Sequence, residues 1–109
     1  MPFIKLKTNV EIKDKERLKT LFGKVITAIP GKEEWMTMIS FEEKVDLYLA
    51  GSGEPCAMVD TLVNEGTNHS KNIEYGDAVI DLISAELGIP RNRIYVIVQE
   101  QDFWYAEKA

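Results

Sequence analysis

The sequence predicts a single α/β domain in which two β-α-β units share a four-stranded sheet and place two helices on one face of it. The main observation is that both halves of the chain repeat one order: a β-rich run, an amphipathic helical pattern and a second β-rich run. The composition agrees, because 109 residues with 45% apolar and 28% charged side chains suffice to bury one core. We therefore treat residues 1–109 as one domain.

The first unit begins with residues 3–10, which mix apolar and polar side chains and predict a strand. Residues 14–29 predict an amphipathic helix, because their apolar side chains recur at spacings of three and four. Asp14 is suited to cap the start of this helix, and the Pro-Gly pair at residues 30–31 ends it. Residues 35–41 predict the second strand.

The second unit repeats this order after a connecting segment. Residues 42–53 predict a turn, a short strand in the sequence DLYLAG and a glycine-rich loop. Residues 56–63 predict a strand, and a helix follows from near Ser70 to Gly88. The apolar face of this helix is expected to consist of Ile73, Val79, Leu82, Ile83 and Leu87.

The last predicted strand, residues 94–99, is apolar on both of its faces and precedes a short tail, residues 101–109. A strand of this kind is typical of a sheet that is covered on both sides. Two helices cover only one face, so the other face must meet another apolar surface, and the simplest is a second copy of the chain. We expect an oligomer whose sheets face inward.

Charge and composition argue against several classes of protein. The net charge of -5, from 18 acidic and 13 basic residues, disfavours nucleic acid as a partner, because binding it requires a basic surface. No apolar run suits a membrane span or a secretory signal, so a cytoplasmic protein with no membrane partner is expected, and export without a signal stays open. Cys56 and His69 are single residues of their kinds, so we expect no internal disulfide, no metal site and no cofactor.

Pro2 is the best candidate for chemistry. If Met1 is removed, Pro2 carries a free secondary amine, one of the few backbone groups that can act as a base near neutral pH. If Met1 stays, the nitrogen of Pro2 belongs to a tertiary amide and has no basic lone pair. The alternative is a proline that is simply tolerated at a chain terminus.

Four short motifs occur in an order that is typical of one family. They are PFI followed by TNV near the start, the pair Gly31-Lys32, GSGEPCA at residues 51–57 and IPRNRIYV at residues 89–96. With these motifs the chain resembles the macrophage migration inhibitory factor and D-dopachrome tautomerase family over nearly its whole length. The resemblance implies a homotrimer with an inner barrel of sheets and a pocket at each subunit interface. It also implies keto-enol tautomerisation of phenylpyruvate-like α-keto acids by the N-terminal proline.

The resemblance also implies roles for individual residues. Lys32 would bind the substrate carboxylate and lower the pKa of the Pro2 amine, although a lysine after a helix can also simply favour the helix dipole. Tyr95 would come from a neighbouring subunit as a pocket wall, with core packing as the alternative. Phe3 and Trp104 are further candidate walls, and simple packing is the favoured alternative for Trp104.

Several positions depart from the family pattern. Ile97 stands where mammalian members carry a polar amide, so a hydrogen bond to the far end of the substrate would be lost. An isoleucine-glycine pair that helps to hold substrate in the family corresponds here to the region Asn64-Glu65-Gly66, and the acidic residue is expected to weaken anion binding. The tail lacks the usual GWN-type ending. Val59 replaces the second cysteine of a Cys-x-x-Cys motif, which excludes thiol-disulfide activity through that motif.

The leading prediction is a trimeric tautomerase with Pro2 as base and acid and a small aromatic α-keto acid as substrate. The predicted substrate-binding residues are Lys32, Asn64, Tyr95, Phe3, Ile97 and Trp104. Two alternatives stay open. One is a non-catalytic trimer that binds a receptor protein, as the cytokine members do, and the other is a homologue that has kept the trimer and lost catalysis.

Overall fold

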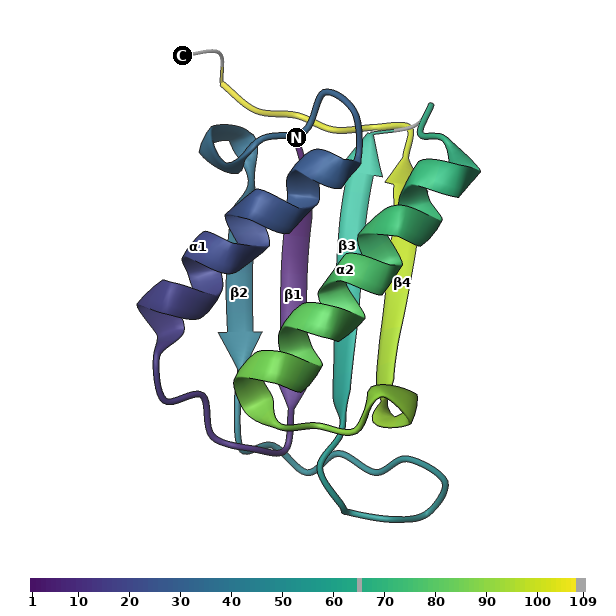
Figure 1. Cartoon of the computed structure of the whole chain (residues 1–109). Coiled ribbons are helices and arrows are strands. Elements are labelled where there is room, and N and C mark those ends of the chain that lie inside the picture. Colours follow the sequence, from purple (N-terminus) through teal and green to yellow (C-terminus); the bar gives the residue numbers. More distant parts are fainter. Residues whose placement is uncertain (65, 108–109) are drawn as a thin grey trace.

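The chain folds into one layer of sheet packed against one layer of helices (Figure 1). The computed structural model describes residues 1–64 and 66–107. The strands in this part of the chain are β1 (Phe3–Thr8), β2 (Met38–Glu42), β3 (Ala57–Asn64) and β4 (Ile94–Gln101). The helices are α1 (Lys15–Val25) and α2 (His69–Leu87), with short 3₁₀ turns η1 (Ile26–Ala28), η2 (Glu34–Met36) and η3 (Arg91–Arg93).

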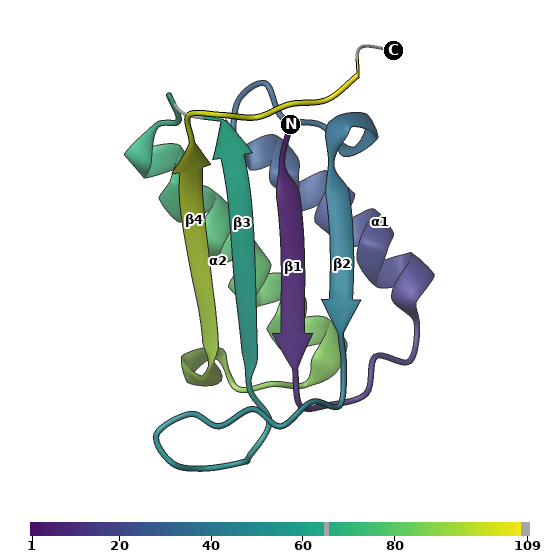
Figure 2. The same cartoon turned by 180° about the vertical axis from the view of Figure 1, so that it is seen from behind.

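The strands form one mixed sheet in the order β2-β1-β3-β4. β1 pairs with β2 in parallel and with β3 antiparallel, and β3 pairs with β4 in parallel. Each parallel pair is connected through a helix, which confirms the two predicted β-α-β units. Both helices lie on the same face of the sheet, and the view from behind shows the strands of the opposite face (Figure 2).

The core lies between the sheet and the two helices. Alternate residues of β1 and β3 point towards the helices and are buried, which is the period of a strand with one covered face. The largest fully buried side chains come from the strands, the helices and the adjoining turns: Tyr75, Phe22, Ile4, Leu6, Leu18, Ile26, Ile29, Ile83, Ile89, Val59, Val63 and Val79. Burying each such side chain contributes about 1.5–3 kcal/mol to folding.

One polar pair lies inside this core. The hydroxyl oxygens of Thr61 on β3 and Tyr75 on α2 are 2.7 Å apart, and both residues are fully buried. Burial raises the pKa of Tyr75 well above its ordinary value, so its hydroxyl stays protonated. The hydrogen bond satisfies two groups that would otherwise be costly to bury.

Local signals set the ends of both helices. Asp14 caps α1 as predicted, because its carboxylate accepts a hydrogen bond from the Arg17 backbone N–H at 3.0 Å. Asn68 caps α2 by accepting from two backbone amides of the first turn, and Gly88 ends the helix in the left-handed region at a φ of 69°. The single histidine, His69, is the exposed first residue of α2 rather than its cap.

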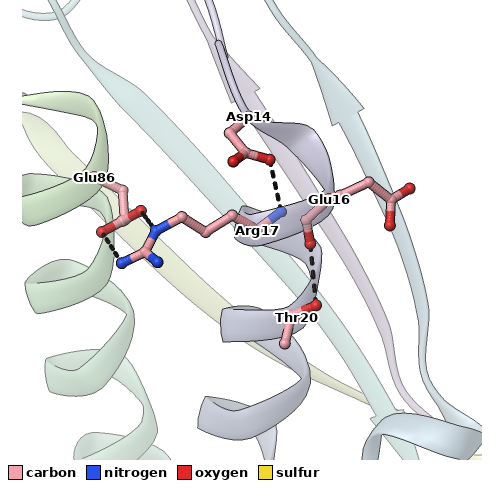
Figure 3. A network of polar contacts seen from close by, with 5 residues as sticks. All are labelled: Asp14, Glu16, Arg17, Thr20 and Glu86. Atoms are coloured by element: carbon pink, nitrogen blue, oxygen red, sulfur yellow. Dashed lines mark hydrogen bonds and ion pairs between the residues drawn. The ribbon is translucent and has the colours of Figure 1, made fainter.

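An ion pair joins the start of α1 to the last turn of α2 (Figure 3). The Arg17 guanidinium meets the Glu86 carboxylate with Nε–Oε1 at 2.6 Å and Nη2–Oε2 at 3.3 Å. In the same turn the Thr20 hydroxyl donates to the Glu16 carbonyl oxygen at 3.1 Å. The hydrogen bonds from Arg17 lower the pKa of Glu86, and they raise the pKa of Arg17.

Two predicted elements near the connecting segment are wrong. The predicted strand in DLYLAG is absent from the described residues, where Leu49 and Ser52 form only an isolated bridge with N–O distances of 3.0 Å. Among the described residues no strand pairs with this segment, and side chains hold it instead. The strand predicted at residues 35–41 starts only at Met38, because η2 occupies the preceding turn.

The predicted buried face of the second helix is partly wrong. Ile73 is 53% exposed, whereas Tyr75 occupies the buried position one turn before Val79. Val79, Leu82 and Ile83 are buried as predicted. The first helix agrees better with its prediction, residues 14–29. α1 ends at Val25, and η1 continues the helical turns to Ala28.

The open face of the sheet, which is turned to the viewer in Figure 2, carries more polar side chains than the last strand alone predicts. β4 presents Tyr95 and Ile97 there, 56% and 38% exposed. In the middle of the sheet, however, Lys5 and Asp60 lie opposite one another, and Asp60 accepts a hydrogen bond from the Gln99 side chain at 2.7 Å. The expectation of an apolar second face is therefore wrong for the centre of the sheet.

Candidate active site

The start of β1 holds Pro2 inside the fold. Pro2 is buried, and its carbonyl oxygen accepts a hydrogen bond from the Met38 backbone N–H at 3.0 Å. The α-amino group of Met1 donates to Asn64 Oδ1, at the end of β3, at 3.2 Å. The N-terminus is thus held between β2 and β3.

Lys32 lies beside the same terminus. The turn that carries it follows η1, where the Lys32 backbone N–H donates to the Ile29 carbonyl oxygen at 3.1 Å. Gly31 permits this turn, because its φ of 82° lies in the left-handed region. Burial, and then the positive charge of Lys32, lower the pKa of the Met1 α-amino group below its ordinary value. The turn therefore places a cation where it acts on the terminal amine.

The C-terminal tail completes a cavity around the N-terminus. Beyond β4 the tail crosses the edge of the sheet where β1 begins and passes the N-terminus in both views (Figures 1 and 2). A cavity of about 800 Å³ lies between the tail and the turn after α1, and its walls include Met1, Lys32, Trp35, Met36 and Trp104. Apart from Lys32, the Met1 amine and Glu107, the described residues that line this space are apolar, aromatic or glycine.

A second hollow adjoins this cavity on the side of the sheet. Its volume is about 600 Å³, and Pro2, Phe3, Met36, Met38 and Trp104 contribute to its walls. Met36 and Trp104 border both spaces. Pro2 itself therefore borders on a space large enough for a small organic molecule.

The structure brings most of the predicted site residues to one end of the sheet. This group consists of Pro2, Phe3, Lys32, Asn64 and Trp104. Glu65, the predicted source of anion repulsion, lies outside the described residues. Lys32 and Trp104 are half-buried, so part of each side chain is accessible to a ligand.

Tyr95 and Ile97 do not join this group within one chain. Tyr95 pairs with Met58, which lies opposite Lys7 on β1, four residues along the strand from Phe3. At about 3.3 Å per residue and about 4.8 Å per strand, Tyr95 lies about 16 Å from the start of β1. It borders a separate apolar pocket of about 190 Å³, together with Tyr48.

Several walls of the cavity were missed by sequence reasoning. They are Trp35, Met36, Phe103 and Tyr105. Trp35 is 78% exposed, and its indole N–H donates to Glu33 Oε2 at 3.0 Å. A signal was present, since large apolar residues in an otherwise polar turn and tail are unusual, but the sequence does not show that the two segments meet.

Comparison with solved structures defines the class of fold. MIF2 of Leishmania major is 28% identical to this chain, with a TM-score of 0.88 and coverage of 97% of this chain and 93% of that one. A macrophage migration inhibitory factor homologue from Prochlorococcus marinus is 27% identical, with a TM-score of 0.82 and coverage of 91% and 88%. The factor from Toxoplasma gondii has the same fold at 21% identity, with a TM-score of 0.83 and coverage of 97% of each chain.

The family model for macrophage migration inhibitory factor (MIF) matches residues 1–105, and the chain belongs to this family. This confirms the family that the four sequence motifs predict. A sequence comparison with curated proteins finds no match. In the part of the chain that the structure describes, no helix combines the length and apolar character that crossing a membrane requires.

Proposed function

We propose that the chain, once Met1 has been removed, is a keto-enol tautomerase for phenylpyruvate-like α-keto acids and uses the Pro2 amine as its base. The observation that carries the proposal is the placement of the N-terminus. With Met1 retained, the N-terminus borders a mainly apolar cavity next to Lys32, and burial and this cation both lower the pKa of the Met1 amine. The proposal assigns the same surroundings to the Pro2 amine, one residue along the chain. These are the two conditions that favour a neutral, proton-accepting amine near neutral pH.

The proposed reaction moves one proton from carbon to oxygen. The neutral Pro2 amine takes a proton from the carbon next to the ketone. The C–H electron pair then forms a C=C bond, and the carbonyl π pair moves to oxygen as an enolate. The enolate oxygen gains a proton, and the protonated amine gives one up and becomes neutral again. The result is the enol, with no change in the number of atoms or electrons.

The cavity walls suit both ends of such a substrate. The carboxylate of an α-keto acid needs a cation, and Lys32 is the lysine that borders the cavity. The aromatic ring needs apolar surface, which Trp35, Met36 and Trp104 offer. The substrate would thus lie with its reactive carbon between the base and the cation.

We also propose that the chain forms a homotrimer, in which a neighbouring chain contributes Tyr95 to the wall of the cavity. Four exposed apolar side chains, Trp35, Met38, Phe103 and Tyr105, border the cavities at the N-terminal end, whereas Tyr48 and Tyr95 lie at the other end. Two different patches on one chain associate head to tail, and such contacts make a closed ring when the rotation closes. In that ring Tyr95 of one chain borders the cavity of the next.

The test is enolisation of phenylpyruvate by the full chain with its N-terminus at Pro2, as verified by intact mass. Replacing Pro2→Gly should lower kcat/KM by about 100-fold or more, the usual size of a general-base contribution. Carbamylating the terminal amine should abolish activity. Pro90→Gly, at an exposed position before η3, is the matched control. A trimer that is inactive with Pro2 exposed would overturn the catalytic proposal and leave a binding role in its place.

A further inference from the structure

We propose that Asn64 is a positioning residue for the base. In the chain that begins at Pro2, its side-chain oxygen accepts a hydrogen bond from the proline amine and directs the remaining lone pair into the cavity. This inference rests on the proposed function in one respect, namely that the amine is the base.

The sheet fixes Asn64 beside the terminus. Asn64 is the last residue of β3 and pairs with Gln101 of β4, so strand pairing restrains its backbone. On the other side β1 runs antiparallel with Phe3 opposite Leu62, and the same register continued places Asn64 opposite Met1. Directly opposed residues in such a pair have Cβ atoms about 4.5–5.5 Å apart. The side chain of Asn64 therefore lies within reach of the start of β1.

The hydrogen bond itself is present in the chain that retains Met1. There the Met1 α-amino group donates to Asn64 Oδ1 at 3.2 Å. Removal of Met1 transfers the free amine to Pro2, one residue nearer to the sheet. Pro2 cannot move away, because it is buried and its carbonyl oxygen is bonded to the Met38 N–H. The proposal requires the Asn64 side chain to rotate so that its Oδ1 follows the amine by this one residue.

The chemistry of a secondary amine makes this acceptor useful. A neutral proline amine has one N–H and one lone pair, so a bond from the N–H to Asn64 fixes the direction of the lone pair. After proton transfer the amine has two N–H groups, of which one keeps the bond to Asn64 and the other returns a proton to the substrate. Lys32 cannot serve in this way, because an ammonium group has no acceptor.

The groups around the amine shift its pKa in opposite directions. Lys32, from the turn after η1, opposes the protonated form, whereas an acceptor such as Asn64 Oδ1 favours it. Glu107 and Tyr105, from the tail, are the other titratable described residues that border the same cavity. Glu33 lies next to Lys32 and accepts from the exposed Trp35 side chain. Changes at Asn64 should therefore alter the titration of the amine without removing these groups.

The test measures the titration of the amine and does not require catalysis. The full chain is treated with methionine aminopeptidase, its start at Pro2 is verified by intact mass, and carbamylation of the N-terminal peptide by cyanate is followed against pH. Asn64→Leu removes the acceptor and should shift the midpoint down by about one pH unit, whereas Asn64→Asp should shift it up by about the same amount. Asn64→Gln keeps an acceptor and should restore the wild-type midpoint. Gln101→Leu, the neighbour of Asn64 on β4, should leave the midpoint unchanged.

Kinetics with phenylpyruvate provide the second readout. Asn64→Leu should lower kcat about tenfold with little change in KM, because the amine loses its orientation while Lys32 still binds the carboxylate. Equal midpoints in wild type, Asn64→Leu and Asn64→Asp would overturn the role of Asn64. Such a result with a tautomerase that still depends on Pro2 would leave the proposed function intact. A wild-type chain without activity would overturn the proposed function, and the carbamylation midpoints would still decide whether Asn64 accepts a hydrogen bond from the amine.

Discussion

In the proposed site Lys32 has two roles: it binds the substrate carboxylate, and its charge lowers the pKa of the terminal amine. Lys32→Gln removes the charge while keeping a side chain of similar length. We expect KM for phenylpyruvate to rise about tenfold to a hundredfold, because a hydrogen bond between charged groups contributes about 1.5–3 kcal/mol. Steady-state kinetics test this, with Lys24→Gln in the exposed last turn of α1 as control. Unchanged kinetic constants in Lys32→Gln would remove the lysine from the site.

The buried hydrogen bond of Tyr75 leads to a prediction about stability rather than activity. Tyr75→Phe leaves the buried Thr61 hydroxyl without its partner at 2.7 Å, so we expect the free energy of unfolding to fall by about 1–3 kcal/mol. The double variant Tyr75→Phe/Thr61→Val removes both polar groups and should recover part of this loss. Urea unfolding of the three proteins measures both effects. Additive losses would show that the two hydroxyls do not depend on each other.

Individual residues differ in how well the sequence predicted their roles. Pro2 and Lys32 border two adjoining hollows that share Trp104. That these residues form one site stays a prediction from family resemblance, since no local pattern connects these distant positions. Tyr75 was missed because an amphipathic pattern counts aliphatic residues, and a tyrosine in a helix can face either side. Its buried place depends on Thr61, a partner from another element.

Among the elements, the segment between β2 and β3 depends most on side chains from elsewhere. The Arg93 guanidinium donates to the carbonyl oxygens of Leu49, Ser52, Glu54 and Pro55 at 2.9–3.3 Å. Asn9 Nδ2 makes three more bonds to carbonyls of the segment, at 3.0–3.1 Å. These contacts replace the strand pairing that the sequence led us to expect.

Arg93→Ala should therefore loosen this segment while leaving the sheet intact. We expect faster hydrogen exchange at the amides of Leu49 and Ser52, which form the isolated bridge, and little change in β1 and β3. Arg91→Ala is the matched control, because Arg91 pairs with Asp81 on α2 instead. Exchange that is equal in both variants would mean that the segment holds its shape without Arg93.

Carboxyl groups that accept hydrogen bonds in the folded chain make the fold sensitive to acid. The hydrogen bond from Arg17 lowers the pKa of Glu86, and the Thr67 hydroxyl does the same for Glu100. A carboxyl group with a lowered folded pKa stabilises the fold above its unfolded pKa, about 4.3, and this contribution is lost as the pH falls through the folded value. Tm should therefore be nearly constant above about pH 5 and fall below about pH 4.

Substitution identifies the groups responsible for this acid sensitivity. Glu86→Gln should lower Tm at pH 7 and show a smaller further fall on acidification, as measured by thermal unfolding followed by circular dichroism. Glu11→Gln, at an exposed position, should behave like wild type. An unchanged pH profile in Glu86→Gln would assign the acid sensitivity to other groups.

Element boundaries were predictable where the signal was local. Asp14 and Gly88 act on the helix ends next to them, so the sequence located both ends well. The predicted strand in DLYLAG did not form because a strand needs a second segment to pair with. In the part of the chain that the structure describes, this segment has only the bridge between Leu49 and Ser52.

The whole molecule presents apolar surface that a single chain leaves exposed. Tyr48, Tyr95, Phe103 and Tyr105 are 56–83% exposed, and they lie at two ends of the sheet. We expect sedimentation equilibrium to give three times the mass of one chain. Tyr95→Glu should shift the equilibrium towards monomers and lower tautomerase activity in parallel, since burying an unpaired charge in an interface is costly.

A control at the same end of the sheet separates assembly from general surface effects. Glu54→Gln changes an exposed residue of the neighbouring loop and should leave the mass unchanged. Monomers of wild-type protein with full activity would contradict the proposed assembly.

The sequence predicted a second copy of the chain because the last strand is apolar on both faces. The charged centre of the open face shows that covering apolar surface there cannot be the only reason for assembly.

The most direct test of the catalytic account compares one protein in two forms, with Met1 retained and with Pro2 exposed. Intact mass gives the fraction of each form, and phenylpyruvate enolisation is measured across mixtures. If Pro2 is the base, the rate should be proportional to the fraction that begins at Pro2, with no activity from the form that keeps Met1. Equal rates for the two forms would contradict it, because a tertiary amide nitrogen cannot accept the proton.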